Sequence, residues 1–168
     1  MAPQQSSSRS LVILLVVSAG CVLAQHPRVP IAPCNGGSPM TAKLLEVRVS
    51  NCNNNFPCIL QKGTQATIEF DYIPSTATNR ITTGATARLG GIPLPFVGTH
   101  NQPACPRIVT KQSRQAVGCS TKAGEVYTYS NTFPILQIYP VTSVTVQWEL
   151  LDSNRQRITC FTIPARIV

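Results

Sequence analysis

Residues 65–73 read QATIEFDYI, and this stretch decides the fold class. Its apolar side chains stand at every second position. Successive side chains of a strand point to opposite faces, so Phe70 and Tyr72 would share one face while Asp71 lies on the other. A helical period of 3.6 residues would scatter the same side chains around the axis. The stretch therefore predicts a β-strand with one buried and one polar face.

The same period of two recurs along the chain. It predicts further strands over residues 43–50, 82–90, 125–132, 143–151 and 157–167. In the first of these, Leu45, Val47 and Val49 are expected on the buried face, against Glu46 and Arg48 on the other. Short strands separated by Pro, Gly and Asn turns, without a helical period of useful length, predict an all-β sandwich of two antiparallel sheets.

Residues 90–96, GGIPLPF, combine apolar side chains with two prolines. Pro93 and Pro95 have no backbone N–H and push their neighbours toward extended geometry, so this segment belongs at a sheet edge or in a loop. Loops lie on the surface and are usually polar. An apolar segment at such a position therefore indicates that its side chains cover another apolar part of the protein.

Residues 1–24 have the features of a secretory signal peptide. Arg9 precedes an apolar run over 11–17, and small residues around Ala24 resemble a signal peptidase site. The run is too short to span a bilayer, although a membrane anchor is the alternative interpretation. We expect one mature domain over residues 25–168 and a secreted, extracellular protein.

The expected mature domain keeps six cysteines, an even number that in an exported chain indicates three disulfides. Six cysteines allow fifteen pairings, but spacing favours Cys52 with Cys58 and Cys105 with Cys119, which leaves Cys34 and Cys160. Zinc is the competing interpretation. It is disfavoured because the chain has no Cys-x-x-Cys pair and no histidine near a cysteine, and we predict no metal or cofactor.

Fourteen Lys and Arg stand against six Asp and Glu, giving a net charge of +8. The basic residues are scattered singly, so a nucleic-acid interface is not indicated. Their densest group is Arg107, Lys111 and Arg114, between Cys105 and Cys119. We expect a solvated loop face there, with docking to an anionic membrane or partner as the alternative.

The sequence does not indicate an enzyme. Neither His26 nor His100 belongs to a recognisable triad spacing, and a Gly-x-Ser-x-Gly elbow is missing. Glu69 and Asp71 share the polar face of one strand, as a glycosidase pair could. We interpret them instead as two solvated strand charges.

Several motifs match one family in order. They are CNGG at 34–37, Cys52 and Cys58 followed by ILQKG, GGIPLPF, YTYSNTFPILQIYP at 127–140, VQWELLD at 146–152 and CFTIPARIV at 160–168. The chain resembles the ML lipid-recognition family, and within it the Niemann-Pick type C-two branch. The resemblance covers nearly all of residues 25–168, including all six cysteines.

The resemblance implies an immunoglobulin-like sandwich with an apolar cavity for a sterol or other lipid between its sheets. It implies the disulfides Cys34–Cys160, Cys52–Cys58 and Cys105–Cys119. It carries the portal over onto Phe96, Pro134, Ile135, Tyr139 and Pro140, the cavity lining onto Trp148, and a membrane-facing basic position onto Lys62. Ile92 and Leu94 in the same rim, and Phe70 and Tyr129 on strands, complete the predicted ligand site.

Two features depart from the family pattern. Arg88 and Gly90 interrupt a segment before the portal that is often more apolar, which weakens the implied membrane contact there. The loop between Cys105 and Cys119 is longer and more basic. We further expect the empty pocket to be partly collapsed, with Phe96 and Tyr139 moving aside on ligand entry, although ordinary packing under a loop is the other interpretation of both rings.

The preferred interpretation is a monomeric secreted carrier for sterols or other lipids. It implies transient contact with an anionic membrane surface, a membrane sterol transporter as a candidate partner, and the endosomal or lysosomal lumen as an alternative location. An innate-immune module that binds microbial lipids or cell-wall components is the first alternative. An adhesion or structural sandwich without a ligand is the second.

Overall fold

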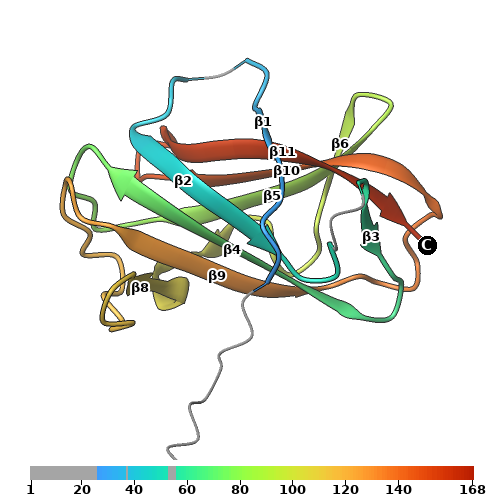
Figure 1. Cartoon of the computed structure of the whole chain (residues 1–168). Helices are drawn as coiled ribbons and strands as arrows, with labels where there is room; N and C mark the ends of the chain where they lie inside the picture. The colour runs from blue at the N-terminus through green and yellow to red at the C-terminus, as the bar shows by residue number, and fades with distance from the viewer. Residues whose placement is uncertain (1–25, 37, 53–55) are drawn as a thin grey trace, which may run out of the picture.

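The computed structural model describes residues 26–36, 38–52 and 56–168, and the predicted leader 1–24 lies outside this part of the chain. Two β-sheets face each other across a shared apolar core (Figure 1). The predicted all-β sandwich is confirmed. A 3₁₀ turn, η1 (Cys105–Arg107), interrupts the strands. No helix in the described ranges is long and apolar enough to cross a membrane.

The four-stranded sheet has the order β2-β4-β9-β8, and all its pairs are antiparallel. Its strands are β2 (Ala42–Val49), β4 (Gln65–Pro74), β8 (Ile108–Thr110) and β9 (Tyr127–Pro134). Strand β4 contains QATIEFDYI and lies between β2 and β9. Phe70 and Tyr72 on its inner face are completely buried.

The seven-stranded sheet has the order β1-β11-β10-β5-β6, with β3 beside β11 and β7 beside β5. Its strands are β1 (Ala32–Pro33), β3 (Cys58–Leu60), β5 (Thr82–Leu89), β6 (Ile92–Pro95), β7 (Gln102–Pro103), β10 (Thr142–Leu151) and β11 (Arg157–Ile167). The pairing of β3 with β11 is parallel, unlike the others in this sheet.

Strands β1 and β3 pair with different parts of β11. Strand β1 lies opposite Phe161 and Thr162, and β3 lies opposite residues 165–167. No described strand pairs with Ile163 and Pro164 on that edge. A proline, which has no N–H to donate, is therefore accommodated inside a long strand.

Leu45 departs from the predicted pattern. We expected it on the buried face with Val47 and Val49, but its side chain is 42% exposed. The register of β2 against β4 shifts between Leu44 and Glu46. This irregularity turns Leu45 outward while Val47 and Val49 stay buried.

Three disulfides join Cys34 to Cys160, Cys52 to Cys58, and Cys105 to Cys119. This is the pairing that spacing favoured and the family resemblance implied, and it leaves none of these six sulfurs for a metal ion. The bond from Cys34 to Cys160 spans a sequence separation of 126 residues. Closing so long a loop stabilises the fold by about 4 to 5 kcal/mol in the chain-entropy estimate.

The outer face of β4 corrects another prediction. We expected Glu69 and Asp71 to be solvated, but Asp71 is completely buried. It accepts hydrogen bonds from Arg48 at 2.9 Å, Lys111 at 2.7 Å and Thr128 at 2.7 Å. Burial alone would raise the pKa of Asp71, but these donors outweigh it and lower the pKa to about 2. Asp71 is thus a buried, ionised carboxylate whose negative charge is balanced by Arg48 and Lys111.

Arg48 also lies on this face and is only 8% exposed. Its guanidinium donates to Glu69 at 2.6 Å as well as to Asp71. Burial alone would lower the pKa of Arg48, but its hydrogen bonds with these carboxylates raise it. Arg48, Glu69, Asp71 and Lys111 are called the charged cluster below.

The basic loop between Cys105 and Cys119 covers the charged cluster. Lys111 pairs with Asp71, and Arg114 lies 3.5 Å from Glu69. Arg107 donates to the Pro103 carbonyl at 2.8 Å. The prediction of a purely solvated loop face is therefore wrong, because two of its three cations bind carboxylates of β4.

Candidate functional site

GGIPLPF forms the edge of the seven-stranded sheet, as its prolines predicted. Gly90 and Gly91 both have positive φ and make the two-residue turn between β5 and β6. Strand β6 pairs with β5 alone. The missing N–H groups of Pro93 and Pro95 therefore cost no hydrogen bond to a second neighbouring strand. The side chains of β6 are all exposed, Ile92 by 65% and Leu94 by 42%.

Phe96 follows β6 and is buried, with only 3% exposure. Its N–H donates to the Ala85 carbonyl at 3.0 Å, which holds the residue against β5. Its ring meets those of Phe133 and Tyr139 edge-on, with centroid distances of 5.2 and 6.1 Å. Phe96 is therefore the member of this rim that reaches between the sheets.

A second segment, the end of β9 and the turn after it, lies beside residues 92–97. Ile135 is buried, whereas Pro134 and Pro140 are exposed and Tyr139 is half-buried. The Tyr139 hydroxyl accepts a hydrogen bond from the Val97 N–H at 3.3 Å. Residues 92–97 and 134–140 therefore touch, and they are called the two lips below.

A small apolar pocket lies between the lips. Its volume is about 30 Å³, and its walls are Ala87, Leu89, Leu94, Pro95, Phe96, Tyr139, Pro140, Thr142, Val144 and Ile167. Pockets for drug-sized ligands usually hold about 300 to 1,000 Å³. The pocket between the lips is far smaller than this, because the lip side chains fill the space between them.

Behind the pocket, aromatic rings form a continuous path into the core. From Phe96 the path runs through Phe133 to Trp148, whose centroids lie 5.2 Å apart. It continues to Tyr129 at 6.3 Å and from there to Phe70 at 5.0 Å. The structure thus connects the predicted cavity residues Trp148, Tyr129 and Phe70 to the lips, through Phe133, which the sequence prediction omitted.

Two polar atoms on this path are buried. The Tyr129 hydroxyl pairs with Thr83 Oγ1 at 2.8 Å, and burial raises the pKa of Tyr129. Trp148 Nε1 has no hydrogen-bond partner among the described residues. An indole N–H without a partner is costly in an apolar core, and the Tyr129 side chain is the polar group that lies beside it.

Large apolar side chains are exposed around the lips. Val97, Ile138 and Val141 are 59, 82 and 60% exposed, and together with Leu94 they are called the apolar rim. The sequence prediction did not include Val97, Ile138 or Val141, although each lies next to a predicted portal residue. Exposed apolar groups gathered in one place indicate an interaction surface.

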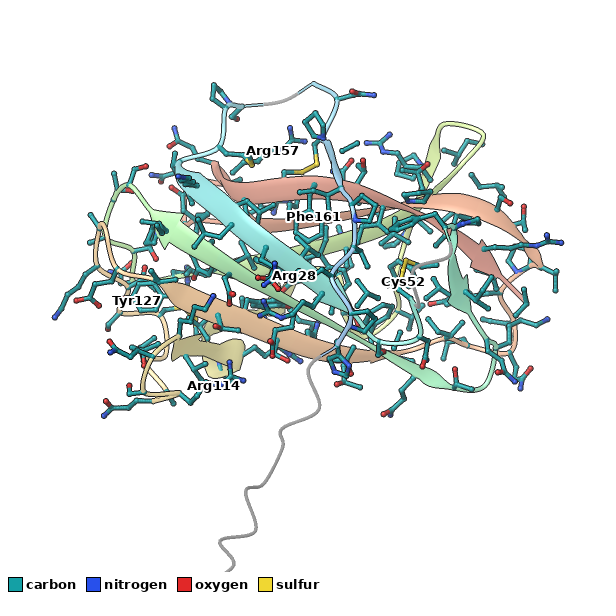
Figure 2. The ribbon with its side chains drawn as sticks, viewed as in Figure 1. Arg28, Cys52, Arg114, Tyr127, Arg157 and Phe161 are labelled. Atoms are coloured by element: carbon teal, nitrogen blue, oxygen red, sulfur yellow. A yellow bond between two sulfur atoms is a disulfide. The ribbon has the colours of Figure 1, made fainter. Side chains whose placement is uncertain are left out.

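Lys62 lies near the lips, in the turn between β3 and β4. Its N–H donates to the Val168 carbonyl at 2.9 Å, and the next residue, Gly63, donates to the Ile135 carbonyl at 2.7 Å. The turn is therefore tied to the second lip and to the end of β11. Figure 2 shows Cys52 at this β3 end of the molecule and Tyr127 and Arg114 at the opposite end.

The sequence matches the ML domain family model over residues 28–167. The chain belongs to the ML domain family. Members of this family are lipid-binding proteins rather than enzymes, so the prediction that this chain is not an enzyme is confirmed.

Individual relatives agree with this assignment. The chain is 34% identical over 110 residues to the ecdysteroid-regulated 16 kDa protein of Manduca sexta, covering 66% of this chain and 70% of that protein. It is 31% identical over 128 residues to NPC intracellular cholesterol transporter 2 homolog a of Drosophila melanogaster, covering 76% of this chain and 81% of that protein.

The fold has a counterpart among solved structures. A Niemann-Pick type C2 protein from Japanese carpenter ant superposes with a TM-score of 0.68 and 23% identity, covering 83% of this ML domain chain and 100% of that chain. This likeness shows that the sandwich is the ML fold.

Proposed function

We propose that this ML domain protein is a secreted carrier that takes up a sterol or similar apolar lipid past the two lips and holds it between the sheets. The observation that carries the proposal is the aromatic path from Phe96 to Phe70, which starts at the apolar pocket. Relatives named as cholesterol transporters support the choice of ligand class.

The energetics of transfer favour such a site. A sterol has roughly 27 carbons, and at about 0.8 kcal/mol per buried methylene its removal from water gains on the order of 15 to 20 kcal/mol. Most of this gain is cancelled when the donor is a bilayer. The site therefore needs an interior as apolar as a membrane, which Ala87, Val144 and Ile167 supply at its mouth.

Opening the lips requires few interactions to break. The contacts across them include the edge-on rings of Phe96 and Tyr139 and the 3.3 Å hydrogen bond from Val97 to Tyr139. A hydroxyl accepts and donates, so Tyr139 can donate to a sterol hydroxyl while still accepting from Val97. Tyr139 thus supplies one polar anchor at the entrance.

The apolar rim supports contact with a donor or acceptor membrane. Ile138, Val97 and Val141 would enter the headgroup region, and the nearby Lys62 ammonium would favour an anionic surface. Such contact would bring the lips to the membrane surface, so the ligand would cross little water. A membrane sterol transporter is the partner we expect for the same surface.

Secretion follows in this proposal from removal of residues 1–24. Mass spectrometry of the N-terminal peptide from cell medium should find Gln25 as the first residue. Retention of residues 1–24 in a membrane fraction would contradict it, and enrichment of the protein in endosomes would favour the luminal alternative.

Solvent extraction of the protein purified from its native source, followed by mass spectrometry of the extract, tests the ligand. A sterol at near-stoichiometric amount and saturable binding of a fluorescent sterol are expected. Bacterial lipid in the extract would favour immune recognition. An extract without lipid, together with no saturable sterol signal, would leave an adhesion or structural role.

A further inference from the structure

A second hollow, separate from the lips, lies on the outer face of the seven-stranded sheet. It has a volume of about 840 Å³ and is called the outer groove. Its lining residues are Asn35, Phe56, Pro57, Arg88, Gly90, Gly91, Ser143, Val144, Thr145, Gln147, Thr162, Pro164 and Ala165. Lipid uptake between the sheets makes no use of this outer face.

The strand pairing explains why the groove exists. Residues 35 and 56–57 stand just after β1 and just before β3, on either side of the β11 positions that no described strand covers. The turn at Gly90 and Gly91 bounds the groove at the other side of the sheet. The groove thus lies over the outer face of β5, β10 and β11, with residues 35 and 56–57 on one side and the Gly90–Gly91 turn on the other.

The floor of the groove is polar. Thr145 lies between Arg88 and Pro164, and Gln147 lies between Thr86 and Thr162, in the register of the three central strands. Hydroxyl and amide groups there offer both donors and acceptors. Hydrocarbon laid over these groups would leave their free hydroxyl and amide hydrogens without partners, although Val144, Pro164 and Ala165 also line the groove.

Arg88 supplies the charge of the groove. Its Nε donates to Gln147 Oε1 at 3.1 Å, which fixes the guanidinium and leaves its outer N–H groups to bind a ligand. No carboxylate lines the part of the groove that the structure describes. The charge therefore complements an anion.

The walls add apolar contact. Phe56, 37% exposed, and Pro57 present flat apolar surface, and Gly91 lets a ligand approach the backbone. A ligand that matches hydroxyl groups, flat C–H surface and one anionic group is an acidic sugar. A peptide strand would need a longer free edge than Ile163 and Pro164 offer.

We propose that the outer groove binds an oligosaccharide that carries carboxylate groups, with Arg88 on the carboxylate and Asn35, Thr145 and Gln147 on the hydroxyls. Arg88 and Gly90 both line this groove.

Titration of the ¹⁵N-labelled protein with a hyaluronan tetrasaccharide tests the proposal, with a chitin tetrasaccharide as the neutral comparison. We expect saturable shifts of the Asn35 and Gln147 side-chain amides and weaker binding of the chitin fragment. Arg88→Gln should weaken hyaluronan binding about tenfold, as the loss of a charge-assisted contact does. Arg80→Gln, an exposed charge that does not line the groove, is the matched control.

Thr145→Val keeps the shape of the floor and removes one hydroxyl, so it should weaken binding about threefold even if Arg88→Gln proves unstable. Absence of saturable binding would overturn the proposal. So would equal weakening by Arg88→Gln and Arg80→Gln, or equal binding of the neutral fragment. Sterol-loaded and sterol-free protein should bind the sugar alike, so failure of lipid binding would leave this test intact.

Discussion

The charged cluster and the two lips differ in how they are held. In the charged cluster, Asp71 is buried beneath Arg48 and Lys111 with contacts of 2.7 to 2.9 Å, and a disulfide closes the covering loop. The lips meet through aromatic edges and a 3.3 Å hydrogen bond to Tyr139. The first region is built from groups that are costly to separate, and the second from groups that lose little on parting.

This difference assigns separate roles to the two sheet ends. Buried charges that lose one partner destabilise a protein strongly, so the charged cluster keeps β2, β4 and the basic loop together. Apolar side chains that part can be covered by a lipid instead of by each other. The lips are therefore able to part while the four-stranded sheet and its covering loop stay together.

The largest effect is expected from Asp71→Asn. The substitution keeps the shape but leaves Arg48 and Lys111 short of one negative charge, so the free energy of unfolding should fall by about 3 to 5 kcal/mol. Urea denaturation measures it. Lys122→Gln, in the exposed pair with Glu125 at 3.8 Å, is the control and should change stability by less than about 1 kcal/mol. Similar losses in both variants would remove the contrast between the two regions.

Phe96→Ala should act mainly on the ligand. Loss of the ring opens the pocket mouth and removes contact area, so sterol affinity should fall about tenfold, which corresponds to about 1.4 kcal/mol. Fluorescent sterol titration at a temperature well below the unfolding midpoint measures this. Loss of the buried ring should also lower the free energy of unfolding by about 3 kcal/mol. The protein should remain folded despite this loss, because three disulfides stabilise it. Unchanged affinity would show that Phe96 is ordinary core packing.

Tyr139→Phe should give a smaller change. It removes the acceptor for the Val97 N–H, and a hydrogen bond of this kind contributes about 1 kcal/mol. The lips should open more easily, so stopped-flow experiments should show sterol release about fivefold faster. Release rates equal to those of the unchanged protein would mean that this hydrogen bond does not hold the lips.

The smallest effect is expected from moderate acid. The pKa of Asp71 is about 2 in the fold against an ordinary 3.8, so its charged form stabilises the native state. That contribution is complete above about pH 5 and is lost progressively as pH falls toward 2. The stability difference between the unchanged protein and Asp71→Asn should be constant from pH 7 to 5 and then shrink. A difference that shrinks between pH 7 and 5 would contradict the role given to Asp71.

Much of the fold and the rims could be predicted because the decisive signals are local. Alternation over residues 65–73 determines a strand and its inner face, and prolines at 93 and 95 determine that this segment lies at a sheet edge. The prediction that Leu45 is buried was wrong, because a register shift in the pairing with β4 turns its side chain outward. Its sequence neighbours carry no signal of that shift.

The sequence by itself therefore determined the strands, the disulfide-forming cysteines and the apolar edge segment at residues 92–96, because periodicity, missing donors and residue type act over a few positions. The segment at residues 134–140 was predicted only through the family resemblance. Only the tertiary structure decided what covers each face. Asp71 is buried because Lys111, 40 residues away, closes over it. The outer groove is bounded by residues 35 and 56–57 on one side and by the distant Gly90–Gly91 turn on the other. Alternation along a strand determines the face on which each side chain lies. Segments far away in the sequence determine which groups cover that face.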